Sequence, residues 1–398
     1  MWKCKKPLDR KRKTIYNIVM IKGVLCLDLG GNMKLKRLAA LVLAGAMCLT
    51  SLVGCGVKPE ETAATLGDQT VSAGLVNFIC KYQKASIDDT YVAYFGEDFW
   101  GKDMYGYGTT MEEDLKASIM NVLHELYTVK AHMADFKVAL TEEETAAIKK
   151  AAQAFIAANS EAALEELGAT EEIVTEMLTL YTIQAKMYDA IIVDVDRNVS
   201  DVEANMRGIT LVQIDLTGKY DDKGNYVKYT DAEKKEVKAT AEKILADAAS
   251  VGLDKAAKNH KYTASDTAYN QKDTSMDKTL LEALNALKVG ETSKLIETKS
   301  YIYIAKIDED VDKKATEENR EAIIAERESK HYSDKLKAWQ KDDGWKVDED
   351  VVERIEFHNI LTQKDPNAKD TEKNTEKNTE KVDSTEKGTE KVEETEGK

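Results

Sequence analysis

The near absence of proline from the central part of this chain constrains its fold more than any other feature. The 398 residues contain three prolines, Pro7, Pro59 and Pro366, so nothing between residues 60 and 365 forces a helix to end. Alanine, glutamate, lysine and leucine, which favour helices, are abundant in the same stretch. The sequence therefore predicts a mainly α-helical protein.

Helical sequence patterns lie before and after one region whose residue pattern is not purely helical. Apolar residues at three- and four-residue spacing begin after Ser72 and resume near Met111, and more helix is expected across residues 161–191. Thr141–Glu144 and Ser200–Glu203 have the pattern of capping boxes, which mark helix starts.

Between residues 206 and 308 the pattern changes. Ile209–Leu216 and Ser300–Ile307 have strand-like composition, and a helix is expected to start at Thr230. A long charged helix, ending near Trp339, follows. We expect a mainly α fold with a smaller α+β domain, in which Trp339 and Trp345 pack the C-terminal helix onto the N-terminal helices.

Residues 33–54 have the anatomy of a secretory signal peptide. Basic residues precede a short apolar run, and Gly54 stands directly before Cys55. The pattern resembles a bacterial lipoprotein signal, which implies a diacylglycerol on the Cys55 sulfur and a stable lipid anchor. The alternative is an ordinary secretory signal with a chance cysteine, and both place the mature chain outside the cytoplasm. Residues 1–32 do not fit this anatomy and are expected to be a misannotated upstream extension, with translation starting at Met33.

Charge and side-chain chemistry exclude several classes of function. Residues 1–54 contain 11 Lys and Arg against 2 Asp and Glu, so residues 55–398 carry a formal charge of −24. No nucleic-acid partner is expected, because phosphate binding needs a basic face, whereas basic or unfolded partners suit this balance. The five histidines lack zinc-motif spacing, and no phosphate loop or dinucleotide fingerprint occurs, so no metal and no cofactor is expected. Cys80 lies in an apolar stretch and is predicted to be a buried, inert thiol.

The ends of the mature chain are expected to lie outside the folded body. Residues 55–63 are predicted to be a tether. Residues 362–398 consist largely of Thr-Glu-Lys repeats without an aromatic residue, so they bury too little apolar surface to order.

The order of these segments resembles that of extracytoplasmic foldase lipoproteins of the PrsA/SurA type. Val138–Glu144 is like a helix start of that family, Val199–Glu203 is like the start of its isomerase domain, and Leu287–Thr298 is like the segment before the last strand of a parvulin domain. The resemblance implies a helical chaperone domain formed by residues 64–199 plus 312–360. It also implies a parvulin-like peptidyl-prolyl isomerase domain at residues 200–311, inserted into the helical domain.

The parvulin-like part departs from its family at two positions. Parvulin domains usually carry a histidine on the first strand and another on the last, and by resemblance these positions hold Thr210 and Tyr303 here. Isomerisation must overcome a barrier of about 20 kcal/mol, so the loss of both histidines predicts weak or absent activity. The alternative is an active isomerase in which Thr210 and Tyr303 form a hydroxyl-based network.

Residues 89–110 interrupt the helical pattern with aromatic residues set among glycines. They form either a loop that caps the helical domain or an adaptable apolar surface for unfolded polypeptides, here called clients. The second interpretation gives six client-binding candidates: Tyr94, Phe95, Phe99, Trp100, Tyr105 and Tyr107.

The favoured interpretation is a chaperone that is lipid-anchored on the extracytoplasmic face of the bacterial cell membrane and binds unfolded secreted polypeptides. An active peptidyl-prolyl isomerase with substituted site residues is the first alternative. An unrelated surface binding lipoprotein, such as a solute receptor, is the second, but the repeated βαβ units of a two-lobed receptor are missing from the sequence.

Overall fold

The computed structural model describes residues 47–48, 57–221, 223–357 and 362–363. Contacts divide the chain into two compact units, which we call unit 1 (residues up to Met187 and from Trp339 onward) and unit 2 (Tyr188–Ala338). The upstream extension, the signal peptide apart from Met47–Cys48, Cys55 and nearly all of the C-terminal tail lie outside the described residues, so the expectations for them stay predictions.

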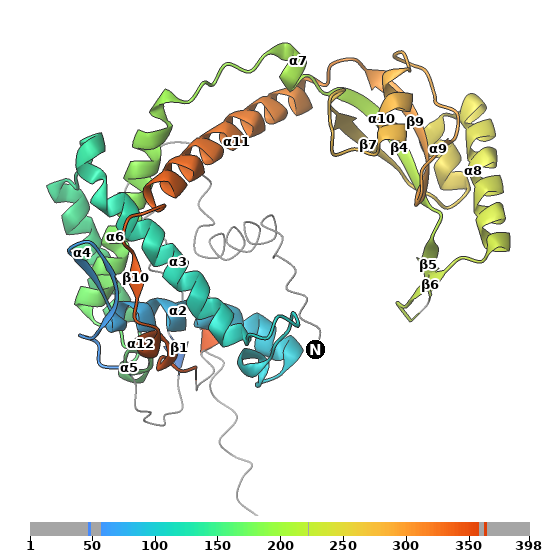
Figure 1. Ribbon diagram of the computed structural model, residues 1–398. Coiled ribbons are helices and arrows are strands. Elements are labelled where there is room, and N and C mark those ends of the chain that lie inside the picture. The colour runs from blue at the N-terminus through green and yellow to red at the C-terminus, as the bar shows by residue number, and fades with distance from the viewer. Residues whose placement is uncertain (1–46, 49–56, 222, 358–361, 364–398) are drawn as a thin grey trace, which may run out of the picture. The chain divides into compact units, whose positions relative to one another are not determined.

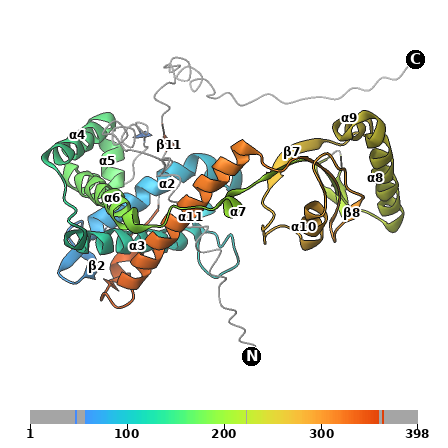
Figure 2. The same ribbon diagram turned by 90° about the horizontal axis from the view of Figure 1, so that it is seen from above.

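Unit 1 consists mainly of helices (Figures 1 and 2). They are α2 (Ala73–Phe95), η2 (Phe99–Gly101), α3 (Met111–Ala131), η3 (Met133–Phe136), α4 (Glu142–Ala158), α5 (Glu161–Leu167), most of α6 (Glu171–Ile191) and α12 (Glu349–Glu353). Its strands are β2 (Thr62–Leu66), β3 (Gln69–Ser72), β10 (Lys346–Val347) and the two-residue pair β1 (Met47–Cys48) and β11 (Thr362–Gln363). Because β10 pairs with β2, the C-terminal segment completes a sheet begun near the N-terminus, and unit 1 is discontinuous in sequence.

The helix starts follow from local sequence. The predicted capping boxes at Thr141–Glu144 and Ser200–Glu203 are formed, and the helix predicted to start at Thr230 has a third box, Thr230–Glu233. A fourth box is formed at Thr110–Glu113. In each box the hydroxyl oxygen accepts the main-chain N–H three residues on, while the glutamate accepts the N–H of the capping residue. Satisfying these helix-end donors is worth about 1 kcal/mol per cap.

The core of unit 1 centres on α2. Phe78 on α2 is fully buried and meets Phe155 on α4 edge-on, with 5.8 Å between ring centroids. Burial of one such side chain contributes about 1.5–3 kcal/mol. Cys80 lies in the same core, so its predicted burial is confirmed, and burial raises the pKa of its thiol to about 12, which supports the prediction that the thiol is inert.

Two histidine–tryptophan stacks hold the C-terminal segment on α3. Trp339 stacks on His132 with 4.1 Å between ring centroids, and Trp345 stacks on His124 with 4.7 Å. His124 Nε2 also lies 2.7 Å from Asp343 Oδ2. The predicted packing of both tryptophans onto the N-terminal helices is confirmed.

Unit 2 contains an antiparallel sheet of order β7-β4-β9-β8 with helices on both faces (Figure 1). Its strands are β4 (Arg207–Asp215), β5 (Gly218–Tyr220), β6 (Tyr226–Lys228), β7 (Ala264–Tyr269), β8 (Ile296–Glu297) and β9 (Tyr301–Glu309). Its helical segments are η4 (Ile192–Asp194), α7 (Asp201–Ala204), α8 (Asp231–Val251), α9 (Leu253–Asn259), α10 (Lys278–Asn285) and α11 (Lys313–Trp339), of which the last residue belongs to unit 1. The predicted fold class, mainly α with a smaller α+β domain, is confirmed.

Alternating residues of the central strands pack into two separate cores. Val212 and Ile304 belong to the core under α8 and α9, whereas Ile209 and Tyr303 belong to the core under α10. Because successive side chains of a strand point to opposite faces, even-numbered residues of these strands join one core and odd-numbered residues join the other.

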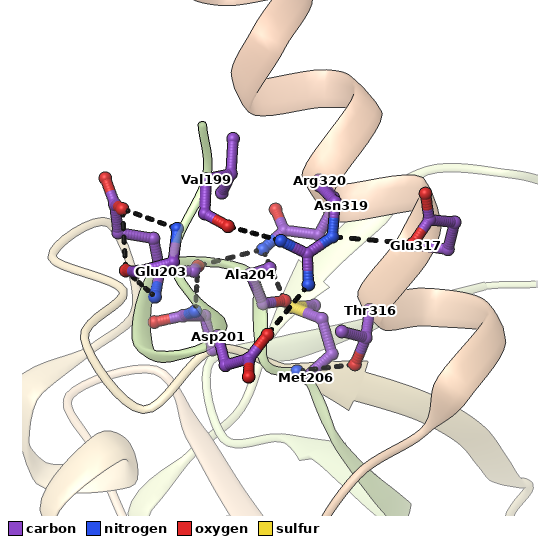
Figure 3. Close-up of polar contacts among 11 residues, drawn as sticks. Val199, Asp201, Glu203, Ala204, Met206, Thr316, Glu317, Asn319 and Arg320 are labelled. Atoms are coloured by element: carbon purple, nitrogen blue, oxygen red, sulfur yellow. Dashed lines mark hydrogen bonds and ion pairs between the residues drawn. The ribbon is translucent and has the colours of Figure 1, made fainter. Parts of the chain in front are cut away.

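The segment between α6 and β4 runs beside α11 and is held there mainly through main-chain carbonyls (Figures 2 and 3). Asn319 Nδ2 donates to the Ala204 carbonyl at 3.0 Å, and the Arg320 guanidinium donates to the Val199 carbonyl. Farther along the helix, Arg327 Nη1 lies 3.1 Å from the carbonyl oxygen of Asp196. We call this set of contacts the linker clamp.

The clamp changes the grouping that the sequence suggested for the long helix. The sequence analysis joined residues 312–360 to the helical domain, but α11 up to Ala338 falls in unit 2. The physical reason is that polar residues of α11 form hydrogen bonds with the linker. In addition, the rings of Tyr332 on α11 and Tyr188 lie 5.1 Å apart, measured between their centroids. The predicted tether is also shorter than expected, since Thr62 already belongs to β2.

Candidate functional site

The aromatic segment of unit 1, residues 91–107, presents several rings to solvent. Tyr94 is 82% exposed and Tyr107 is 58% exposed, while Phe95 and Tyr105 are nearly half exposed. Exposed aromatic side chains this close together in the sequence are candidates for a binding surface. Tyrosine also loses little conformational entropy on binding, because it has few rotatable bonds.

Two members of the predicted set are buried instead. Phe99 is 2% exposed and Trp100 is 5% exposed, and their rings meet edge-on at 5.1 Å. They lie in η2, which packs on the core, so they attach the segment and do not offer it to a client. The exposed part of the predicted set is therefore Tyr94, Phe95, Tyr105 and Tyr107.

A buried charge pair fixes the position of Trp100. Trp100 Nε1 donates to Asp88 Oδ1 at 2.7 Å, and Lys84 Nζ lies 2.5 Å from Asp88 Oδ2. Both charged side chains are almost fully buried, and desolvation lowers the pKa of Lys84. Sequence reasoning missed this pair, although two opposite charges four residues apart within a predicted helix were the available signal.

The loop after η2 is ordered by one carboxylate. Asp103 accepts the main-chain N–H groups of Tyr107 at 3.0 Å and Gly108 at 2.8 Å. The N–H of Gly108 contributes most to a pKa of Asp103 below its usual range. The two exposed rings of Tyr105 and Tyr107 stack at 6.0 Å on this ordered turn. The helix before the segment is also longer than predicted, since α2 continues to Phe95.

The second predicted site does not come together in unit 2. Thr210 shares its sheet face with Val212, and its Oγ1 lies 2.7 Å from Asp308 Oδ2 and 3.1 Å from Asp266 Oδ1. Tyr303 points to the other face, where it is 8% exposed and burial raises its pKa. The proposed hydroxyl network between Thr210 and Tyr303 is therefore not formed, because the sheet separates the two hydroxyls.

The neighbours of Tyr303 on β4 offer little chemistry. Ile209 and Leu211 share its face and are apolar, and the residue directly opposite it is Gln213. The charged residue of β4 that reaches this core is Arg207, and its guanidinium is already held by Asp310, at 2.8 Å, and by the hydroxyl of Tyr269.

Metal sites and membrane-spanning helices are both absent from the described ranges. No group of three His, Cys, Asp or Glu side chains converges there as a metal site requires. No helix among these residues combines the length and apolar character needed to cross a bilayer. His124, His132 and His260 each lie within hydrogen-bond distance of an aspartate.

The comparisons with known proteins give fold-level likenesses only. No protein-family model matches the sequence, and no curated protein matches it. Among solved structures, the chain is similar to the foldase protein PrsA from Lactococcus lactis, with 17% identity, a TM-score of 0.30, and coverage of 74% of this chain and 97% of that one. The peptidylprolyl isomerase PrsA from Bacillus cereus matches with 17% identity and a TM-score of 0.30, over 75% of this chain and 98% of that one. A SurA-like chaperone structure from Campylobacter jejuni matches with 12% identity and a TM-score of 0.25, over 72% of this chain and 98% of that one.

Proposed function

We propose that the protein is an extracytoplasmic chaperone that binds unfolded secreted polypeptides through the exposed rings of the aromatic segment. The supporting observation is the contrast within that segment: Tyr94 and Tyr107 are exposed, while Trp100 beside them is held in the core by Asp88. Such a surface has accessible apolar area at low entropic cost, and holding an unfolded chain requires no more than that.

The same proposal places the protein on the outer face of the cell membrane. Its basis is the sequence before Cys55, which predicts cleavage after Gly54 and a diacylglycerol anchor. In cells, Cys55→Ala is expected to release the protein from the membrane. Membrane association that survives the substitution, with no acyl mass on the N-terminal peptide, would contradict the anchor but not the client-binding role.

We infer further that the α+β domain contributes little isomerase activity. The two positions that resemble the family histidines hold Thr210 and Tyr303, and these side chains lie on opposite faces of the sheet. Prolyl isomerisation of a short peptide is therefore expected to run near its uncatalysed rate, over tens to hundreds of seconds. A clear acceleration that is lost in Tyr303→Phe would instead support the active-isomerase alternative.

An aggregation assay tests the chaperone proposal. The full chain is expected to slow light scattering by a chemically unfolded client, and the double variant Tyr94→Ser/Tyr107→Ser is expected to lose most of this effect. Both positions are exposed, so the variant should fold normally, which circular dichroism checks.

The matched control is Tyr220→Ser in β5, because Tyr220 is 73% exposed but lies in unit 2. It is expected to suppress aggregation as well as the unsubstituted chain does. Equal loss in both variants would mean that exposed tyrosines act nonspecifically, and no suppression by the unsubstituted chain would reject the proposed function.

A further inference from the structure

An open groove of about 1020 Å³ crosses unit 1 beside the aromatic segment. It lies between the first half of α3 and the C-terminal segment that includes β10 and α12. Trp345, Val352 and Phe357 contribute apolar residues to its lining, and Trp100, which is only 5% exposed, adds little to it. Small-ligand pockets typically enclose about 300–1,000 Å³, so this groove lies at the upper end of that range, and it has room for several side chains of a bound segment.

The charge of the groove is strongly unbalanced. One ammonium group, that of Lys116, lines it, and this group lies 2.7 Å from Glu112 Oε1 and donates to the Glu353 carbonyl at 3.1 Å. Against this single neutralised cation stand six carboxylates: Glu112, Glu113, Asp114, Glu349, Glu353 and Glu356.

Two of these carboxylates are available to a ligand. Glu349 and Glu353, on α12, are exposed, and neither side chain has a Lys, Arg or His partner at ion-pair distance within the described chain. Glu112, by contrast, is paired with Lys116, and Glu113 is used in the capping box of α3. A positively charged group of a ligand is therefore expected to bind most favourably at the α12 side of the groove.

We propose that this groove binds cationic amphipathic segments of unfolded polypeptides, in which Lys or Arg alternates with large apolar side chains. The proposal rests on the proposed chaperone function and names the client chemistry. The apolar side chains would cover Trp345 and Phe357, and the basic heads would lie against Glu349 and Glu353. The methylene stems of Lys and Arg also pack well on aromatic faces. The formal charge of −24 on residues 55–398 would raise the encounter rate with such segments.

The chain's own C-terminal tail does not have this chemistry. Five of its lysines, at 373, 377, 381, 387 and 391, each follow a glutamate directly, so their charge is locally cancelled. Between residues 362 and 398 there is no aromatic residue, leucine, isoleucine or methionine. The tail thus offers the groove neither net positive charge nor large apolar side chains.

Binding of three matched synthetic peptides to the full chain tests the proposal by fluorescence anisotropy. In the peptides, phenylalanine alternates with lysine, glutamine or glutamate. The lysine peptide is expected to bind tightest and the glutamate peptide weakest. Salt should weaken the lysine peptide most, because the screening length falls to about 10 Å at 0.1 M ionic strength.

Two pairs of variants locate the site. Glu349→Gln/Glu353→Gln is expected to weaken the lysine peptide roughly three- to tenfold and to leave the glutamine peptide unchanged. Its control, Glu142→Gln/Glu143→Gln, removes the same charge from exposed first-turn positions of α4 and should have no effect. Ala117→Trp, at an exposed position of α3 that lines the groove, should weaken the lysine and glutamine peptides alike, whereas Ala146→Trp on α4 should weaken neither.

Three results would overturn the inference. The first is equal affinity for all three peptides, and the second is equal peptide affinity of each variant and its control. If aggregation suppression persists in either case, the proposed chaperone function would still stand. The third is a gain in peptide affinity of about tenfold after removal of residues 364–398, which would make the tail the occupant.

Discussion

The aromatic segment of unit 1 and the sheet of unit 2 use the same residue types in opposite ways. In the segment, Tyr94 and Tyr107 are exposed to solvent, while Asp88 binds the buried Trp100 and Asp103 binds the main chain of the loop. In the sheet, Tyr303 is packed under α10, and the hydroxyl of Thr210 faces carboxylates on the other side. The difference teaches that the presence of tyrosines and hydroxyls says little about function until each one's exposure and sheet face are known.

The strongest test of this comparison removes the buried carboxylate that holds the aromatic segment on the core. Asp88→Ala leaves the Lys84 ammonium buried without its closest carboxylate and takes the hydrogen-bond acceptor from Trp100. Breaking a buried pair in this way is expected to destabilise unit 1 by about 3–5 kcal/mol, measured by urea unfolding. Aggregation suppression should fall together with stability.

The matched control is Asp98→Ala, which breaks an ion pair with Lys102 that is also four residues away but largely exposed. It should leave the unfolding midpoint almost unchanged. Similar midpoints for the two variants would contradict the role given to the buried pair.

A second test breaks unit 2 and asks whether unit 1 is affected. Ile304→Ala deletes a fully buried side chain between the sheet and α8, which should cost about 2–5 kcal/mol. Hydrogen exchange at β4 amides is expected to accelerate, while amides of α2 keep their protection and aggregation suppression persists. Loss of suppression with intact α2 protection would mean that the sheet takes part in client binding.

The smallest expected effect sharpens the role of Asp103. Its pKa is depressed in the folded chain, chiefly by the N–H of Gly108, so its stabilising contribution is present above about pH 3.9 and is lost as the pH falls through the lower folded value. Exchange of the Gly108 amide, followed downward from neutral pH, should show a step in this window. Asp103→Asn should abolish the step, and a step that remains would assign it to another group.

Sequence reasoning succeeded where the interacting groups are close in the chain. The capping boxes join residues three apart, so the local residue pattern alone was enough to locate Thr141–Glu144 and Thr230–Glu233. The packing of Trp339 was predictable because a large aromatic ring at the end of a charged helix has few other places to go.

The remaining features depend on long-range geometry. A one-residue change in register moves a strand residue to the other face, so sequence alone did not reveal that Thr210 and Tyr303 are separated. Phe99 and Tyr94 both stand near glycine, and only the core contact of η2 distinguishes the buried ring from the exposed one. Glu353 lies more than 200 residues from Lys116, so the groove had no sequence signature.

The linker clamp has an evolutionary consequence. Arg327 recognises the carbonyl oxygens of Asp196 and Asn198, which every amino acid carries, and the side chain of Asn198 is exposed. The identity of such linker residues is therefore free to drift over time, whereas the guanidinium is hard to replace because lysine lacks its planar fork of donors. In diverging descendants of this chain, the arginines of α11 and their carboxylate partners Asp201 and Glu203 should be retained longer than linker residues such as Asn198, which contribute only a carbonyl group.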